Sequence, residues 1–168
     1  MDISVKLISY SVLKDNISVQ LVCDEGKDDD PTLPLQLTSL QGQHRYIHIG
    51  ELETKGMIKS VAIRKGIHIL LHLPCTQYVA KKLFYMMESG KQVRLIPVSE
   101  SEGKLNELLE KAAKMTDKAP NELLKELTTF TNKSGKLIEG RESAGELSPR
   151  HQEVVIYRLN QMLHGDNA

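Results

Sequence analysis

The sequence predicts an α+β protein, in which a six-stranded β-barrel-like domain at residues 1–99 precedes a three-helix segment at residues 104–165. Two observations predict this division. Strand-forming runs separated by turn residues fill the first part, whereas leucine, lysine, glutamate and alanine dominate the second part at helical spacing. In addition, an order of two strands, a connecting helical segment and a third strand occurs twice in the first part, which indicates a duplicated unit.

The first copy of this unit begins with a predicted hairpin, whose turn is Lys14-Asp15-Asn16. A polar loop follows, and Pro31 and Pro34 leave room for no more than a short turn of helix after it. The predicted elements of this copy are strands at residues 5–12, 17–22 and 45–49, with the connecting segment at residues 35–41.

The second copy contains the better supported helix. Thr76 is a suitable N-cap, and Val79, Leu83 and Met86 share one helical face until Gly90 ends the pattern. The predicted elements of this copy are strands at residues 58–63, 67–73 and 92–98, with the helix at residues 76–89.

The two cysteines support the duplication, because Cys23 and Cys75 each follow the second strand of a copy. Chance similarity between two hairpins is the alternative. Two cysteines are too few for a disulfide scaffold, so we expect both to be buried thiols. Six strands can close into a barrel that has no exposed edge. In element order the region resembles the cradle-loop barrels, such as the RIFT and double-psi types, and an oligonucleotide-binding barrel with other connections is the competing prediction.

A polar hinge is expected at residues 99–103, and helices follow it. The last helix begins with Ser148 as its cap and Pro149 in its first turn, and ends at Gly165. A loop is expected at residues 132–146. The apolar faces of the helices are predicted to comprise Leu105, Leu108, Leu109, Ala112, Leu123, Leu127, Phe130, Val155, Leu159 and Met162. Because about 61 residues are near the lower limit for an independent core, we expect burial against a second copy and hence a homo-oligomer.

Composition and motifs exclude several classes of function. No apolar stretch approaches the roughly 20 residues of a membrane helix, and the N-terminus lacks the pattern of a signal peptide, so we expect a cytoplasmic protein. The sequence contains no phosphate-binding glycine loop, no zinc-protease motif and no nucleophile elbow. We therefore expect a protein that is not an enzyme and that needs no cofactor.

Two patterns suggest metal binding, and both have a simpler explanation. Histidines occur four residues apart at His44 and His48, and again at His68 and His72. In strands such pairs are roughly 13 Å apart and cannot share one ion, so we expect outward-facing histidines. The acidic run at residues 28–30 lacks the ligand positions of a calcium loop, and we expect it to be a solvated turn. No metal site is predicted.

The second copy carries the one basic region of the sequence, although the net formal charge of the chain is zero. Such a cluster is suited to several phosphate contacts, whereas a solvated lysine face is the alternative. The candidate nucleic-acid-binding residues are Arg64, Lys65, Lys81, Lys82, Lys91 and Arg94. The tyrosines that could stack on bases are Tyr10, Tyr46, Tyr78 and Tyr85.

Residues 121–163 contain FTNKSGK, then Gly140-Arg141, then LSPRHQ. This stretch resembles the tails of phage-type single-strand DNA-binding and recombination-accessory proteins. The resemblance implies a DNA-binding protein of a phage or mobile element that works beside DNA-processing machinery without catalytic residues. The competing hypothesis is a protein-interaction module, an adaptor or inhibitor of a host or phage protein, which binds no nucleic acid.

Overall fold

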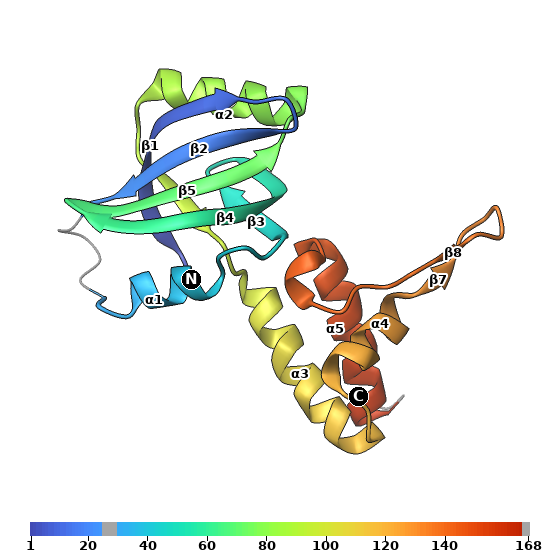
Figure 1. Cartoon of the computed structure of the whole chain (residues 1–168). Helices are drawn as coiled ribbons and strands as arrows, with labels where there is room; N and C mark the ends of the chain where they lie inside the picture. Colours follow the sequence, from blue (N-terminus) through green and yellow to red (C-terminus); the bar gives the residue numbers. More distant parts are fainter. Residues whose placement is uncertain (25–29, 166–168) are drawn as a thin grey trace. The chain divides into compact units, whose positions relative to one another are not determined.

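The computed structural model describes residues 1–24 and 30–165, and the chain divides into two compact units, Met1–Pro97 and Val98–Ala168 (Figure 1). We call them the barrel unit and the helical unit. The predicted α+β class is confirmed, since a closed six-stranded antiparallel barrel is followed by helices α3–α5. Within the described residues, no helix combines the length and apolarity that crossing a membrane requires.

The strands of the barrel unit follow the order β1-β2-β5-β4-β3-β6, and β6 pairs with β1 to close the barrel. All of these pairs are antiparallel. The elements are β1 (Ile3–Val12), β2 (Asn16–Cys23), α1 (Leu33–Ser39), β3 (Arg45–Ile49), β4 (Leu52–Arg64), β5 (Gly66–Pro74), α2 (Gln77–Ser89) and β6 (Val93–Ile96).

The strand pairing has the same form in the two copies. Strand β1 pairs with β2 and β6, and its counterpart β4 pairs with β5 and β3. Four ladders join one copy to the other, namely β1–β6, β2–β5, β3–β4 and β3–β6. Both hairpins also contain a register irregularity at the same point, between Leu7 and Ser9 in β1 and between Ile58 and Ser60 in β4. The repeated order of strand, strand, helix and strand is thus present in the structure.

The expected equivalence of the two cysteines is wrong. At the matching irregularities, Leu7 of β1 pairs with Leu21, and its counterpart in β4 pairs with Leu71. Counting onward from these partners, Cys23 corresponds to a leucine of β5 and not to Cys75. Cys23 is buried at the end of β2, whereas Cys75 is exposed beyond β5, so the expectation of two buried thiols is also wrong. The strand pairing, and not the presence of a cysteine, shows which residues of the two copies correspond.

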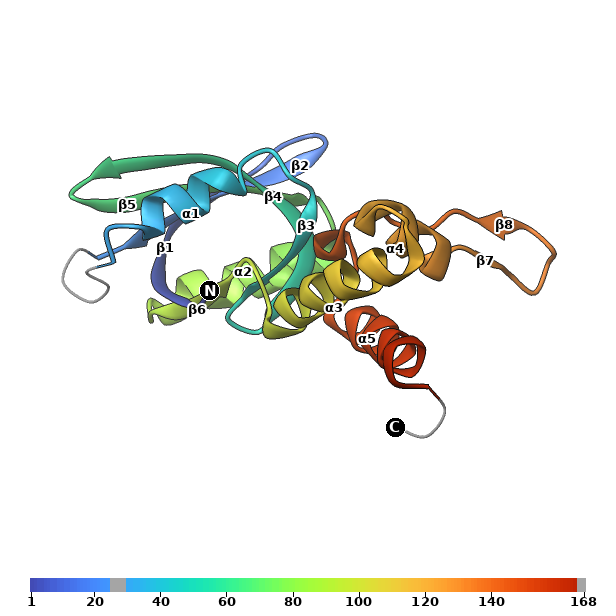
Figure 2. The same cartoon turned by 90° about the horizontal axis from the view of Figure 1, so that it is seen from below.

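Helices α1 and α2 lie on opposite sides of the barrel (Figures 1 and 2). Leu37 of α1 and Leu83 of α2 are fully buried in the barrel core. Helix α2 begins as predicted, because the Thr76 hydroxyl accepts a hydrogen bond of 3.2 Å from the Val79 amide. It ends at Gly90, which has the left-handed φ of 61° that glycine tolerates. The short helix α1 agrees with the limit that the prolines set.

Strand β4 is longer than predicted, because it belongs to two ladders. Its first half pairs with β3, ending at Gly56 opposite Arg45, and its second half pairs with β5 from Met57 onward. At this transition a Cβ atom on Gly56 would lie 2.6 Å from Leu73 Cδ2 and 3.0 Å from the His72 carbonyl oxygen, so any larger residue would crowd β5 here. In the sequence, the glycine and the polar residues before it resemble a turn.

The helical unit contains α3 (Glu100–Thr116), α4 (Pro120–Thr128), β7 (Phe130–Thr131), β8 (Leu137–Ile138), the 3-10 helix η1 (Ala144–Glu146) and α5 (Pro149–His164). Helix α3 packs along α5. The buried core residues of the unit are Leu105, Leu109, Ala112, Leu123, Leu124, Ala144, Leu147, Val155, Ile156 and Leu159. Most of the predicted apolar faces are therefore covered within the unit, and they offer no surface to a second copy. The homo-oligomer stays a prediction.

The expected polar hinge is instead the first turn of α3. The Ser99 hydroxyl accepts a hydrogen bond of 3.2 Å from the Glu102 amide, and Ser101 and Glu102 are buried. Serine followed by glutamate three residues later is a capping pattern, which accounts for the helix start. Two other expectations are wrong: the 132–146 loop includes β8 and η1, and Phe130 is exposed in the hairpin rather than packed on α4.

The buried side chain of Gln152 connects three segments of the helical unit. Its Oε1 atom accepts hydrogen bonds from the hydroxyls of Ser99 and Ser101 before and within α3. Its Nε2 atom donates to the carbonyls of Ala144, at 2.9 Å, and Leu147, at 3.2 Å. Every polar atom of this amide thus has a partner, as a buried polar group requires.

Replacing Gln152 with methionine should lower the free energy of unfolding of the helical unit by about 2–4 kcal/mol, because two buried carbonyls lose their donor and two hydroxyls lose their acceptor. Urea denaturation followed by circular dichroism measures the change. The matched control is Gln161→Met on the exposed side of α5, which should change stability by less than about 0.5 kcal/mol. Equal stability of the two variants would contradict the role assigned to Gln152.

The different positions of the two cysteines predict one rapidly reacting thiol per native chain. A thiol reagent such as DTNB should modify Cys75 quickly and Cys23 only after unfolding, since reagents reach exposed sulfur first. The Cys75→Ser variant should therefore lose the fast phase, whereas Cys23→Ser should keep it. A fast phase that survives in Cys75→Ser would show that the end of β2 is accessible.

Candidate nucleic-acid interface

The outward face of α2 carries three exposed aromatic side chains. Val79 and Leu83 face the barrel core, so the helical period turns Tyr78, which precedes them, and Phe84 and Tyr85, which follow them, toward solvent. The exposed fractions are 51% for Tyr78, 50% for Phe84 and 57% for Tyr85. Three half-exposed aromatic side chains on the outward side of one helix form an exposed apolar patch, the kind of surface feature for which a binding role can be proposed.

Lysines alternate with these aromatic rings on α2. Tyr78, Lys82 and Tyr85 are spaced by four and three residues and therefore lie along one side of the helix. The Lys82 Nζ atom lies 6.0 Å from the centroid of the Tyr78 ring and 3.7 Å from Glu51 Oε2. Glu51 is almost fully exposed, so this ion pair contributes little energy and can give way to another anion. The exposed residue Lys81 lies beside this row.

An open pocket of about 390 Å³ lies beside this face of α2. The end of α2, the turn between β3 and β4, and the segment that leads into β6 surround it. Its lining residues are Gly50, Glu51, Leu52, Lys82, Tyr85, Met86, Ser89, Lys91, Gln92 and Val93. Two of the predicted site residues, Lys82 and Lys91, therefore come together at one pocket with the Tyr85 ring.

Glycine is required in the turn that forms one wall of this pocket. Gly50 has a left-handed φ of 56°, and its amide donates a 2.9 Å hydrogen bond to the Arg94 carbonyl. A Cβ atom at this position would lie 3.2 Å from Met86 Sδ and 3.3 Å from Val93 Cγ1. The absence of a side chain allows the turn to approach α2 and β6 closely. We call this pocket, together with the outward residues of α2, the α2 face. Those outward residues are Tyr78, Lys81, Lys82, Phe84 and Tyr85.

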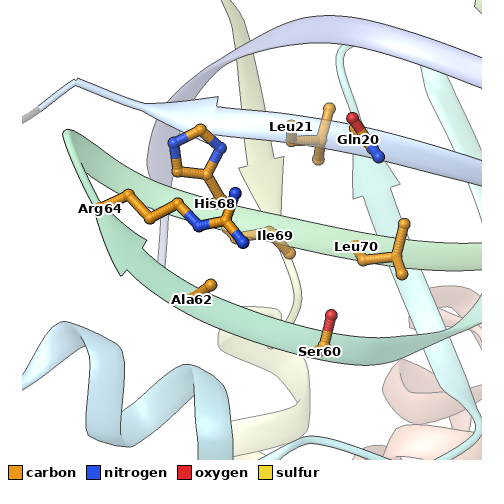
Figure 3. Close-up of a pocket in the computed structure, with 8 residues that line it drawn as sticks. All are labelled: Gln20, Leu21, Ser60, Ala62, Arg64, His68, Ile69 and Leu70. Atoms are coloured by element: carbon orange, nitrogen blue, oxygen red, sulfur yellow. The ribbon is translucent and has the colours of Figure 1, made fainter.

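Arg64 and Lys65 lie elsewhere, at the tip of the β4–β5 hairpin. Figure 3 shows the Arg64 side chain extending from the hairpin tip back along the sheet, on the side of the sheet from which the His68 imidazole also projects. Arg64 and His68 line a shallow groove of about 170 Å³. The small residues Ser60 and Ala62 of β4 also line it and leave room for it. The groove is a second basic place on the barrel, separate from the residues that line the pocket at α2.

Arg94 of β6 is engaged by an acidic residue. Its Nε atom donates a 3.1 Å hydrogen bond to Asp2 Oδ1, and its guanidinium group also forms an ion pair with this carboxylate. A phosphate would have to displace Asp2, so Arg94 is a weaker candidate than the lysines of the α2 face. The six predicted residues are thus distributed over three places, of which only the α2 face combines positive charge with exposed rings.

The four predicted tyrosines also differ in exposure. Tyr78 and Tyr85 are exposed, whereas Tyr10 packs against the barrel core and Tyr46 is half-buried with Lys55 Nζ 5.7 Å from its ring centroid. Sequence reasoning missed Phe84, although the spacing that buries Leu83 already places its neighbour outside. The Phe84 and Tyr85 rings meet edge to face at a centroid distance of 5.9 Å, an arrangement that aromatic pairs favour.

The histidines of β5 face outward as predicted. His68 and His72 alternate with buried Ile69 and Leu71 along the strand. His44 precedes β3 rather than lying within it. Among the residues that the structure describes, no three histidine, cysteine, aspartate or glutamate side chains gather as a metal site would require.

Asp28 and Asp29 of the predicted acidic turn lie outside the described residues. The Thr32 hydroxyl donates a 2.6 Å hydrogen bond to Asp30 Oδ1, and the Thr32 amide donates one of 2.9 Å. These two bonds hold the pKa of the exposed Asp30 carboxyl below its ordinary value. Asp30 thus stabilises the start of α1 locally, as a turn residue does.

Comparison of the chain with protein-family profiles, curated proteins and solved structures finds no match. The resemblance of residues 121–163 to phage-type DNA-binding tails therefore has no family assignment beside it.

Proposed function

We propose that the protein is a non-enzymatic accessory protein that binds single-stranded nucleic acid through the α2 face. The observation that carries the proposal is the row Tyr78, Lys82 and Tyr85, beside a pocket that Lys82 and Lys91 line. Bases stack on exposed aromatic rings with little regard to sequence, at about 1–3 kcal/mol per base. The lysines supply contacts to the phosphates that connect those bases.

The choice of single strands over duplexes follows from the rings. Base faces are accessible for stacking only where bases are unpaired, whereas a duplex presents base edges and phosphates. Tyr78, Phe84 and Tyr85 on one surface would be superfluous for contacts to phosphates alone. Their exposure therefore favours a single strand as the occupant.

The charge of this surface predicts weak and salt-sensitive binding. Lys81, Lys82 and Lys91 provide three positive charges, while Glu51 and Glu88 lie nearby on the β3–β4 turn and on α2. Three phosphate contacts correspond to a slope of about −2 for the logarithm of affinity against the logarithm of salt concentration. Because the chain has no net charge, its overall electrostatic field adds no long-range attraction.

A role beside the DNA-processing machinery of a phage or mobile element is also part of the proposal. Its support is the resemblance of residues 121–163 to the tails of such accessory proteins. The geometry of the α2 face is compatible with DNA or RNA, since stacking and phosphate contacts occur with both.

Fluorescence anisotropy with a labelled 20-nucleotide single strand, at two salt concentrations, tests the proposal. Lys82→Glu and Lys91→Glu should each weaken binding and reduce the salt dependence, and Tyr85→Ala should weaken binding about tenfold without changing the salt dependence. The matched control is Lys14→Glu, an exposed lysine of the β1–β2 turn, which should bind as the unaltered protein does.

Two outcomes would reject the proposal. The first is no binding of the unaltered protein at low salt, which would favour the protein-interaction module. The second is an equal loss in Lys14→Glu and Lys82→Glu, which would show that only net charge matters and that the α2 face has no special role.

A further inference from the structure

The β7–β8 hairpin of the helical unit is another place where exposed apolar and basic side chains occur together. Phe130 is 57% exposed and Leu137 is 61% exposed on its two short strands. Lys133 and Lys136 lie in its turn, and no acidic residue occurs from residue 130 to residue 138. In both views the hairpin extends away from the helices of its own unit (Figures 1 and 2).

The turn of this hairpin is held by one side chain. Asn132 Oδ1 accepts three hydrogen bonds, of 3.1 Å from the Ser134 amide, 2.7 Å from the Ser134 hydroxyl and 2.9 Å from the Lys136 amide. The Asn132 amide donates to the Lys136 carbonyl at 2.9 Å, and Gly135 supplies the left-handed φ of 83°. The two lysines are therefore presented by a defined turn.

The base of the hairpin is fixed to the end of α4. The Thr129 hydroxyl accepts a 2.9 Å hydrogen bond from the Gly140 amide, and the Thr128 hydroxyl accepts one of 2.8 Å from the Arg141 amide. A Cβ atom on Gly140 would lie 2.2 Å from the Lys125 carbonyl oxygen, so only glycine permits this approach. The hairpin is thus ordered at both ends, while Phe130 stays outside the core of the unit.

We propose that this hairpin binds in a groove of duplex nucleic acid. A two-stranded β-ribbon fits the major groove of a DNA duplex, which is about 12 Å wide. Lys133 and Lys136 in the turn would contact phosphates. Phe130 and Leu137, which the strand register places on opposite faces of the ribbon, would contact sugars on the two walls of the groove. The proposal goes beyond the α2 face, because it concerns the other unit and paired strands.

Charge favours nucleic acid over a protein groove as the occupant. The stretch from Phe130 to Ile138 carries two lysines and no acid, and Arg141 follows close to its base. Of the two acids that follow the hairpin, Glu139 lies at its base and not in its turn, and Glu142 is engaged by Lys125 at 3.6 Å. Positive charge in the turn beside exposed apolar side chains matches the combination of phosphate and base contacts.

The test measures binding of the full-length protein to a labelled 20-base-pair duplex and to a single strand. It is carried out in a Lys82→Glu, Lys91→Glu background, so that the α2 face does not contribute. Adding Lys133→Glu with Lys136→Glu should lower duplex affinity about tenfold or more and reduce the salt slope by about 2. Phe130→Ser with Leu137→Ser should weaken duplex binding and leave the salt slope unchanged. All four side chains are exposed, so these variants should fold normally.

The matched control is Lys104→Glu with Lys114→Glu, two exposed lysines of α3 in the same unit, which should retain duplex affinity. Absence of duplex binding at low salt, or an equal loss in the control, would overturn the proposal. Full duplex binding by both hairpin variants would overturn it as well, and would leave a protein partner as the occupant. None of these results depends on single-strand binding by the α2 face, so the two proposals fail separately.

Discussion

The antiparallel ladder between β2 and β5 is the interaction on which the barrel depends. It pairs every residue of β2 with one of β5, from Asn16 opposite Pro74 to Cys23 opposite Ile67, and it joins the two copies of the repeated unit. Ile17, Val19 and Leu21 face the core opposite buried partners on β5. A slip of one residue would turn these side chains to solvent, so burial fixes the register. The same register places His68 and Leu70 outside, where they form the groove that Arg64 also lines.

The chemistry of the α2 face follows from this core. Leu83 is fully buried beneath the helix. Because successive residues of a helix are separated by a fixed angle, Phe84 and Tyr85 then point away from the core. The Gly50 turn then brings β6, with Lys91 before it, close to the same helix. A packed core therefore positions both the rings and a lysine from a different part of the chain.

Local patterns predicted those parts of the fold that depend on neighbouring residues. Thr76 and Ser148 mark helix starts in the sequence, and both hydroxyls accept a capping hydrogen bond in the structure. The alternation of Ile67 to Leu73 likewise predicted which side chains of β5 are buried. The first half of β4 was missed, because its partner β3 and the close approach at Gly56 are set by tertiary packing and not by local propensity.

The sequence predicted which residues belong to the candidate site better than it predicted where those residues lie. Charge counting identified Lys82 and Lys91, and these two do meet at one pocket. It also selected Arg94, whose engagement by Asp2 joins residues at opposite ends of the barrel unit's sequence and leaves no local trace. Asp2 and Arg94 meet only because β1 pairs with β6 and closes the barrel.

The strand pairing of the barrel is symmetric between the two copies of the unit. Every strand of each copy pairs with a strand of the other copy, and exchanging the copies reproduces the same set of strand pairs. A peptide with a single copy would keep only the pairing of its first two strands and would leave its third strand without a partner. Two identical peptides would together supply every partner that the closed barrel needs. The barrel thus has the strand pairing of a symmetric dimer within one polypeptide, and because the two halves differ in sequence, each presents its own surface chemistry.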